Sequence, residues 1–113
     1  MENQLAYYNE TGKSRDEFDE ALPGPMEAYS TFRKQVYRDG ALSLKTKRLI
    51  ALALGLQSGC TRCIQGQTKD AVAAGATKDE VLEATSVAIV MGGTHASSET
   101  WRIVEVLKEL GRW

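Results

Sequence analysis

Both prolines of the chain stand close together, at Pro23 and Pro25, and none follows them. Proline breaks helices because it lacks the backbone N–H and clashes with the preceding turn, so the chain beyond position 25 is free to form helices. The one stretch that resembles a strand, "SVAIVM", follows a helix-start signal, and its length up to Gly92 suits a helix better. The sequence therefore predicts an all-α fold, a compact bundle of about five or six short helices.

Capping signals divide the chain into these helices. Ser14 and Glu17 form a capping-box pattern, so residues 1–24 are expected to be an N-terminal arm and a short helix. A second helix is expected to begin at Pro25 and to end at Asp39–Gly40. The remaining helices are expected after an N-cap at Ser43, from about Cys60 to Ala74, after a capping box at Thr77 and Glu80, and from about Ala96 or Ser97 to Leu110.

Size and charge narrow the class of protein. A chain of 113 residues suits one domain, residues 1–113, and a net charge of −1 gives no electrostatic reason to expect nucleic acid or an anionic membrane as partner. The first residues lack the basic and apolar regions of a signal peptide. The longest apolar run, Leu49–Leu56, has the length of a buried or interface helix segment. We therefore expect a cytoplasmic protein, whose cysteines rest mainly as thiols.

The two cysteines, Cys60 and Cys63, form a C-x-x-C motif in "SGCTRCIQGQ". The break at Ser58–Gly59 places Cys60 at the start of a helix, where unpaired N–H groups and the helix dipole favour a thiolate. The spacing puts both sulfurs on one helix face, close enough to form a disulfide. A redox pair is favoured over structural thiols and over a zinc site. Zinc needs four ligands and the chain adds only His95, so no metal or other cofactor is expected.

Two polar residues lie at positions from which they can influence this pair. Arg48 precedes Cys60 by twelve residues, and a nearby guanidinium stabilises a thiolate. Gln67 follows Cys63 by one helical turn, and its amide can donate to sulfur or hold a water but cannot take up a proton at neutral pH. The single histidine, His95, is expected in an exposed helix-entry loop, and it can replace a base only if packing brings it near Cys63.

From about Leu42 to the C-terminus the sequence resembles the carboxymuconolactone decarboxylase family, and within it the AhpD-like alkylhydroperoxidase branch. The resemblance rests on the apolar helix before C-x-x-C, the "AVAAGAT" turn, the "DEVLEA" helix opening and the "VMGG" helix end. It implies an all-helical fold and a homo-oligomer, commonly a trimer or a hexamer.

In that branch a glutamate twelve residues before the first cysteine and a histidine four residues after the second form a proton relay. The resemblance places Cys60 and Cys63 in the redox pair, with the second cysteine usually the one that attacks the peroxide. The relay positions are occupied here by Arg48 and Gln67, so both relay residues are changed. Dipole arguments favour Cys60 as the more acidic thiol, which leaves the attacking cysteine open, with a slight preference for Cys63.

Three functions remain open at this point. The first is a thiol-dependent antioxidant enzyme, a peroxidase or disulfide reductase, with a hydroperoxide or disulfide as substrate and a thiol as reductant. Its candidate catalytic residues are Cys60, Cys63, Gln67 and Arg48. The second is a non-catalytic redox sensor or oligomeric scaffold, which the loss of the relay favours. The third, lactone decarboxylation, ranks last because that branch relies on a histidine near this region, which the chain lacks.

Overall fold

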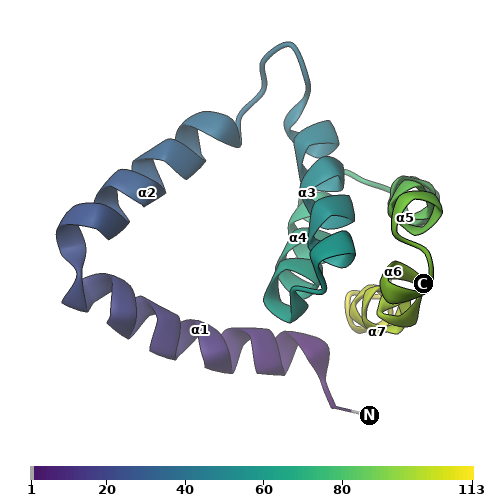
Figure 1. The fold of residues 1–113 in the computed structure, drawn as a ribbon, viewed down its shortest axis with the longest axis horizontal. Coiled ribbons are helices and arrows are strands. Elements are labelled where there is room, and N and C mark those ends of the chain that lie inside the picture. Colours follow the sequence, from purple (N-terminus) through teal and green to yellow (C-terminus); the bar gives the residue numbers. More distant parts are fainter. Residues whose placement is uncertain (1) are drawn as a thin grey trace.

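The computed structural model describes residues 2–113, and that part of the chain is folded into helices joined by short turns (Figure 1). The helices are α1 (Gln4–Ala21), α2 (Pro23–Val36), α3 (Leu44–Ser58), α4 (Thr61–Ala73), α5 (Lys78–Gly92), α6 (Thr94–Ser98) and α7 (Thr100–Glu109). The all-α prediction is confirmed. The last predicted helix is divided at Glu99 into α6 and α7. Among the described residues, no helix is long and apolar enough to cross a bilayer.

Helix α1 is the main departure from expectation, because it begins at Gln4 rather than near Ser14. The Asn3 side chain caps it by accepting the N–H of Ala6 at 2.7 Å. The carboxylate of Glu109, on α7, accepts the N–H groups of Gln4 and of the next residue, each at 2.8 Å. A carboxylate at this end satisfies free donors and complements the helix dipole. No local pattern reveals this cap, since Glu109 lies 105 positions from Gln4 in the sequence.

The starts of α3, α4 and α5 follow the predicted signals, whereas α2 begins at Pro23 rather than Pro25 and α6 begins at Thr94 rather than at Ala96 or Ser97. The hydroxyl of Ser43 accepts the N–H of Thr46 at 3.1 Å and caps α3. Thr77 and Glu80 form the reciprocal capping box of α5. Between α3 and α4 the backbone of Gly59 has a φ of 70°, in the left-handed region that glycine adopts without steric cost. These local interactions fix where the cysteine helix begins.

The hydrophobic core lies between α3, α4, α5 and α7, with α6 adding Ala96. Its buried side chains include Leu52, Leu56, Ile64, Ala71, Val81, Ala88, Ile103 and Leu107. Of the apolar run Leu49–Leu56, Leu52 and Leu56 are buried, whereas Leu54 is 64% exposed. In Figure 1, α1 and α2 form two sides of an open triangle whose third side is α3 and α4. None of the residues of α2 is buried, so α2 is a wall beside the core rather than part of it.

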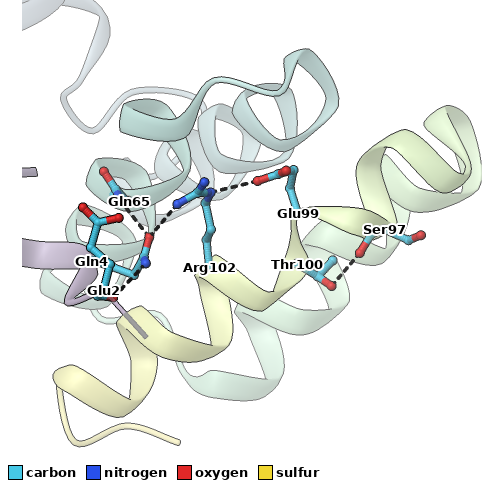
Figure 2. Close-up of polar contacts among 7 residues, drawn as sticks. All are labelled: Glu2, Gln4, Gln65, Ser97, Glu99, Thr100 and Arg102. Atoms are coloured by element: carbon cyan, nitrogen blue, oxygen red, sulfur yellow. Dashed lines mark hydrogen bonds and ion pairs between the residues drawn. The ribbon is translucent and has the colours of Figure 1, made fainter. Parts of the chain in front are cut away.

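A buried polar network attaches the start of α1 to this core (Figure 2). The side-chain amide of Gln65, on α4, donates to Oε1 of Gln4 at 2.8 Å, and Arg102, on α7, donates to the same oxygen at 3.0 Å. Arg102 also pairs with Glu99 at 2.8 Å. Both glutamines are fully buried, where an unpaired amide would cost free energy. The network therefore holds α1 against α4, the helix that carries the cysteines.

Candidate active site

Cys60 and Cys63 form a disulfide at the start of α4, with their Cα atoms 5.1 Å apart. Cys60 is the N-cap residue of α4, and its Sγ accepts the N–H of Cys63 at 3.2 Å. The predicted position at a helix start is confirmed. In the dithiol form the same N–H favours a thiolate at Cys60. Cys63 is exposed and Cys60 only half-buried, so Cys63 is the more accessible of the two residues.

A close crossing of α3 and α4 positions this pair. Gly55 is buried on α3, and a Cβ at that position would lie 2.8 Å from Cβ of Cys63, closer than such atoms approach. The carbonyl of Gly55 also accepts the N–H of Cys60 at 3.1 Å. One residue without a side chain therefore sets the place of both cysteines.

We expect Gly55→Ala to destabilise the protein. Alanine favours a helix over glycine by about 1 kcal/mol, but overpacking a close contact costs about 1–3 kcal/mol. The atoms in the way are Cβ and the backbone carbon of Cys63, which cannot rotate aside. The measurement is the free energy of unfolding in urea, made on the reduced proteins.

Gly12→Ala is the matched control for this substitution, because Gly12 also lies within a helix. A Cβ there would lie 3.7 Å from the Arg62 guanidinium, an ordinary contact, so this variant should be as stable as the parent or more so. If Gly55→Ala were as stable as Gly12→Ala, the close crossing would not hold the cysteine pair.

Arg48 and Gln67, the residues at the two relay positions, lie next to each other. Nη1 of Arg48 donates to Oε1 of Gln67 at 3.2 Å. The Arg48 guanidinium stacks 3.8 Å from the ring centroid of Tyr37 and lies 3.5 Å from Oδ2 of Asp70. The amide nitrogen of Gln67 is 3.5 Å from the Tyr37 hydroxyl. The charge of Arg48 is thus shared with Asp70, and Gln67 carries an amide, which cannot take up a proton at neutral pH.

Cys63 lies where two hollows of the surface meet, and Gln67 and Arg33 also line both. The larger hollow is a mostly apolar groove of about 730 Å³ between α2 and α3. We call it the apolar groove; its apolar walls are Val36, Tyr37, Ile50, Ala51 and Leu54. The smaller is a pocket of about 250 Å³ that reaches both cysteines. We call it the arginine pocket; its other walls are Tyr8, Arg15, Arg33, Arg62, Gly66, Gln67 and Asp70.

Helix α1 supplies one wall of the arginine pocket and positions Arg62, the residue between the cysteines. Nη1 of Arg62 donates to the carbonyl of Tyr8 at 2.6 Å and also bonds the hydroxyl of Thr11. Its guanidinium lies 4.3 Å from the centroid of the Tyr8 ring. The ring in turn fits against Gly66, where a Cβ would lie 2.7 Å from a ring carbon. A glycine on α4 therefore lets α1 approach the cysteine pair.

Helix α2 contributes Arg33, which lies between two aromatic rings. Its guanidinium is 5.7 Å from the centroid of Tyr29 and 5.3 Å from that of Tyr37. Hydrogen bonding with Tyr29 raises the pKa of Arg33 above its ordinary value, so this side chain stays charged at any working pH. Arg15, which belongs to α1, is the third arginine that lines this pocket, together with Arg33 and Arg62. Within residues 2–113, no carboxylate forms an ion pair with Arg15, Arg33 or Arg62.

His95 is exposed, as expected, but it lies in the short helix α6 rather than in a loop. Its ring packs toward Gly59, with Nε2 3.1 Å from the point where a Cβ on Gly59 would stand. Neither the apolar groove nor the arginine pocket includes it. In the described part of the chain, no group of three His, Cys, Asp or Glu side chains is arranged to hold a metal ion.

The sequence reading found the cysteines and the two relay positions but missed most of the arginine pocket. Tyr8, Arg15 and Arg33 come from helices that precede the motif, and no spacing rule connects them with Cys60. Asp70 had a usable signal, because it follows Gln67 by three residues and so lies on the same face of a helix.

Comparison with known proteins shows which family and which individual proteins the chain is similar to in sequence. The family model described as "Carboxymuconolactone decarboxylase family" matches residues 23–106. A protein of Paracoccus denitrificans, named as uncharacterized protein 4 in the cox locus, is 37% identical over 84 residues, which span 74% of this chain and 76% of that protein. An uncharacterized protein of Cupriavidus necator is 36% identical over 74 residues, 66% of each chain.

Solved structures agree with this placement. An apo carboxymuconolactone decarboxylase family protein from Legionella pneumophila superposes with a TM-score of 0.89 and 28% identity, covering 96% of this chain and 97% of that one. A Thermotoga maritima protein of the same family gives a TM-score of 0.78 and 30% identity over 88% of this chain and 87% of its own. That protein is described as a candidate for a role in an antioxidative response.

Proposed function

The chain belongs to the carboxymuconolactone decarboxylase family, and from that premise we propose that it is a thiol-dependent oxidoreductase that reduces hydroperoxides with the Cys60–Cys63 pair. One observation carries the proposal: an exposed Cys63 lies where two pockets meet and is already within bonding distance of Cys60. The antioxidative role suggested for the Thermotoga maritima relative supports it.

The proposed reaction begins with the dithiol. The thiolate of Cys63 attacks the terminal oxygen of the hydroperoxide, so an S–O bond forms, the O–O bond breaks, and the alkoxide takes a proton from water to leave as an alcohol. Cys63 is then a sulfenic acid. The Cys60 thiolate, favoured by the start of α4, attacks the Cys63 sulfur, and hydroxide leaves as the disulfide forms. A dithiol reductant restores both thiols by exchange.

The altered relay makes the first step slow in this proposal. Neither Gln67 nor Arg48 gives up a proton readily to the departing alkoxide, and general-acid help is typically worth about 10²–10⁴-fold in rate. A disulfide substrate is less affected, because a thiolate leaving group needs less protonation than an alkoxide. Disulfide reduction is therefore the second reaction that the same pair can support.

The test is a free-thiol count on fully reduced protein after one equivalent of cumene hydroperoxide. We expect both thiols to disappear together, with an intact mass lower by two hydrogens. A folded protein that keeps both thiols for hours would contradict the enzyme and would favour the redox-sensor or scaffold function, which the replacement of both relay residues by Arg48 and Gln67 also fits.

We also propose that the protein works in the cytoplasm as a homo-oligomer, a trimer or a hexamer as the family implies. In support, α5 exposes Val87, Val90 and Met91 by 58%, 79% and 81%. Such large exposed apolar side chains on one helix commonly mark a protein interface. A monomeric mass in sedimentation equilibrium would contradict the oligomer.

A further inference from the structure

We propose that the apolar groove and the arginine pocket form one binding site for a long-chain carboxylate, and that the hydroperoxide reduced at Cys63 belongs to this class. The reaction at Cys63 in this inference rests on the proposed function, whereas the class of ligand rests on the two pockets. The carboxylate binds in the arginine pocket, and the aliphatic chain lies along the groove. Cys63 lies at the junction, where a peroxide carried within the chain would meet it.

Charge is the first argument. The whole chain has a net charge of −1, yet the arginine pocket gathers Arg15, Arg33 and Arg62 against the single carboxylate of Asp70. Asp70 is already engaged, since it lies 3.5 Å from Arg48 and 3.7 Å from Lys69. Guanidinium groups bind carboxylates with paired hydrogen bonds, and a cleft of one sign concentrates ligands of the other. The pocket therefore favours an anion.

An orphaned polar atom supports the same conclusion. Nη1 of Arg62 is occupied by Tyr8 and Thr11, but its buried Nε has no hydrogen-bond partner among residues 2–113. Arg33 lies beside the rings of Tyr29 and Tyr37, and no carboxylate of residues 2–113 neutralises its charge. Buried donors are normally satisfied, and an acceptor in the pocket would satisfy this one.

The second argument is the shape and the polarity of the groove. Val36, Ile50 and Leu54 are all more than a third exposed along it. A volume of about 730 Å³ is within the range that holds small organic molecules, and its wall is mostly apolar. An aliphatic chain gains free energy by covering these side chains. Because Arg33 lines both pockets, one ligand with an acidic end and an apolar body fits the two together.

The experiment compares linoleic acid hydroperoxide with its methyl ester, each below its micelle-forming concentration. The two carry the same peroxide and the same chain, and they differ only in that a neutral methyl ester replaces the carboxylate. We expect the acid to oxidise the thiols of the reduced protein about tenfold faster than the ester, as electrostatic attraction typically does. Raising the salt to 0.5 M should reduce that ratio, because salt screens the attraction.

Variants of α2 residues test whether the preference for the acid over the ester comes from the arginine pocket. Arg33→Gln should bring the ratio of acid rate to ester rate toward one, whereas Arg33→Lys, which keeps the charge, should retain part of it. The matched control is Lys34→Gln, which removes one positive charge from the neighbouring exposed position outside both pockets. An equal loss of the ratio in Lys34→Gln would mean that net charge, not the pocket, selects the acid, and would overturn the inference.

A binding measurement separates this inference from the proposed function. Dodecanoate, which has no peroxide, should protect Cys63 of the reduced protein from the neutral reagent iodoacetamide more strongly than dodecanol does. If acid and ester react equally fast, the inference is wrong and the peroxidase stands. If no hydroperoxide reacts, the peroxidase is wrong, and dodecanoate protection alone supports the carboxylate site. Absence of protection would overturn the site. That result is the one expected if a second copy of the chain covers the groove.

Discussion

Cys63→Ser should lose the reaction with hydroperoxide, with a rate at least about 100-fold lower than that of the parent protein. The thiolate is the nucleophile, and a serine hydroxyl is not ionised at neutral pH. Cys60 remains in this variant, but it is less exposed than Cys63. The measurement is the initial rate of thiol loss in the reduced protein with excess cumene hydroperoxide.

Cys60→Ser should behave differently, because it keeps the attacking sulfur and removes the one that closes the disulfide. It should react once with peroxide and stop at a sulfenic acid on Cys63, which dimedone converts to an adduct visible by mass. The N–H of Cys63 that now contacts Sγ of Cys60 at 3.2 Å can bond the serine hydroxyl instead, so the start of α4 should persist. The reverse pattern, with the adduct on Cys60 in Cys63→Ser, would make Cys60 the attacking residue.

The parts of the fold that sequence predicts well are those fixed by nearby residues. The break at Gly59, the N-cap at Ser43 and the capping box of Thr77 and Glu80 depend on interactions within a turn, and all three are present. The position of Cys60 at a helix start follows from the first of them. Local chemistry thus predicted the geometry of the C-x-x-C motif.

The parts that sequence did not predict depend on residues far apart in the chain. Helix α1 has a local N-cap in Asn3, but Glu109, from the last helix, also binds its first N–H groups. The arginine pocket exists because Gly66 leaves room for Tyr8, which brings α1 and its Arg15 beside α4. A pattern search along the sequence detects neither, since each contact joins segments that only the folded chain brings together.

The contact between Arg48 and Gln67 is a different case, because the family resemblance pointed to both positions and the residue types pointed away from the family's chemistry. The structure brings the two side chains to 3.2 Å and adds Asp70 and Tyr37 as neighbours. Their adjacency means that side chains at the two relay positions can contact each other here, although the glutamate and the histidine of the family relay are absent.

Restoring those groups should therefore accelerate peroxide reduction. In the double variant Arg48→Glu/Gln67→His, the imidazole can take the thiol proton and return it to the alkoxide, a contribution typically worth about 10²–10⁴-fold. Gln67→His alone should gain less, because the Arg48 guanidinium beside the ring disfavours the imidazolium form. The measurement is the second-order rate constant for thiol oxidation by cumene hydroperoxide at pH 7.

The pH dependence of the oxidation rate identifies the cause of any gain in rate. A glutamate at position 48 favours the imidazolium, so the pKa of the new histidine should lie above its usual value near 6.5, and the rate should change with pH in a way that the parent lacks. Arg48→Gln is the control, since it removes the charge without supplying a base and should show no such gain. Circular dichroism must show that the double variant is folded, because the introduced carboxylate would face Asp70. A folded double variant with an unchanged rate would mean that proton transfer to the alkoxide does not limit the reaction.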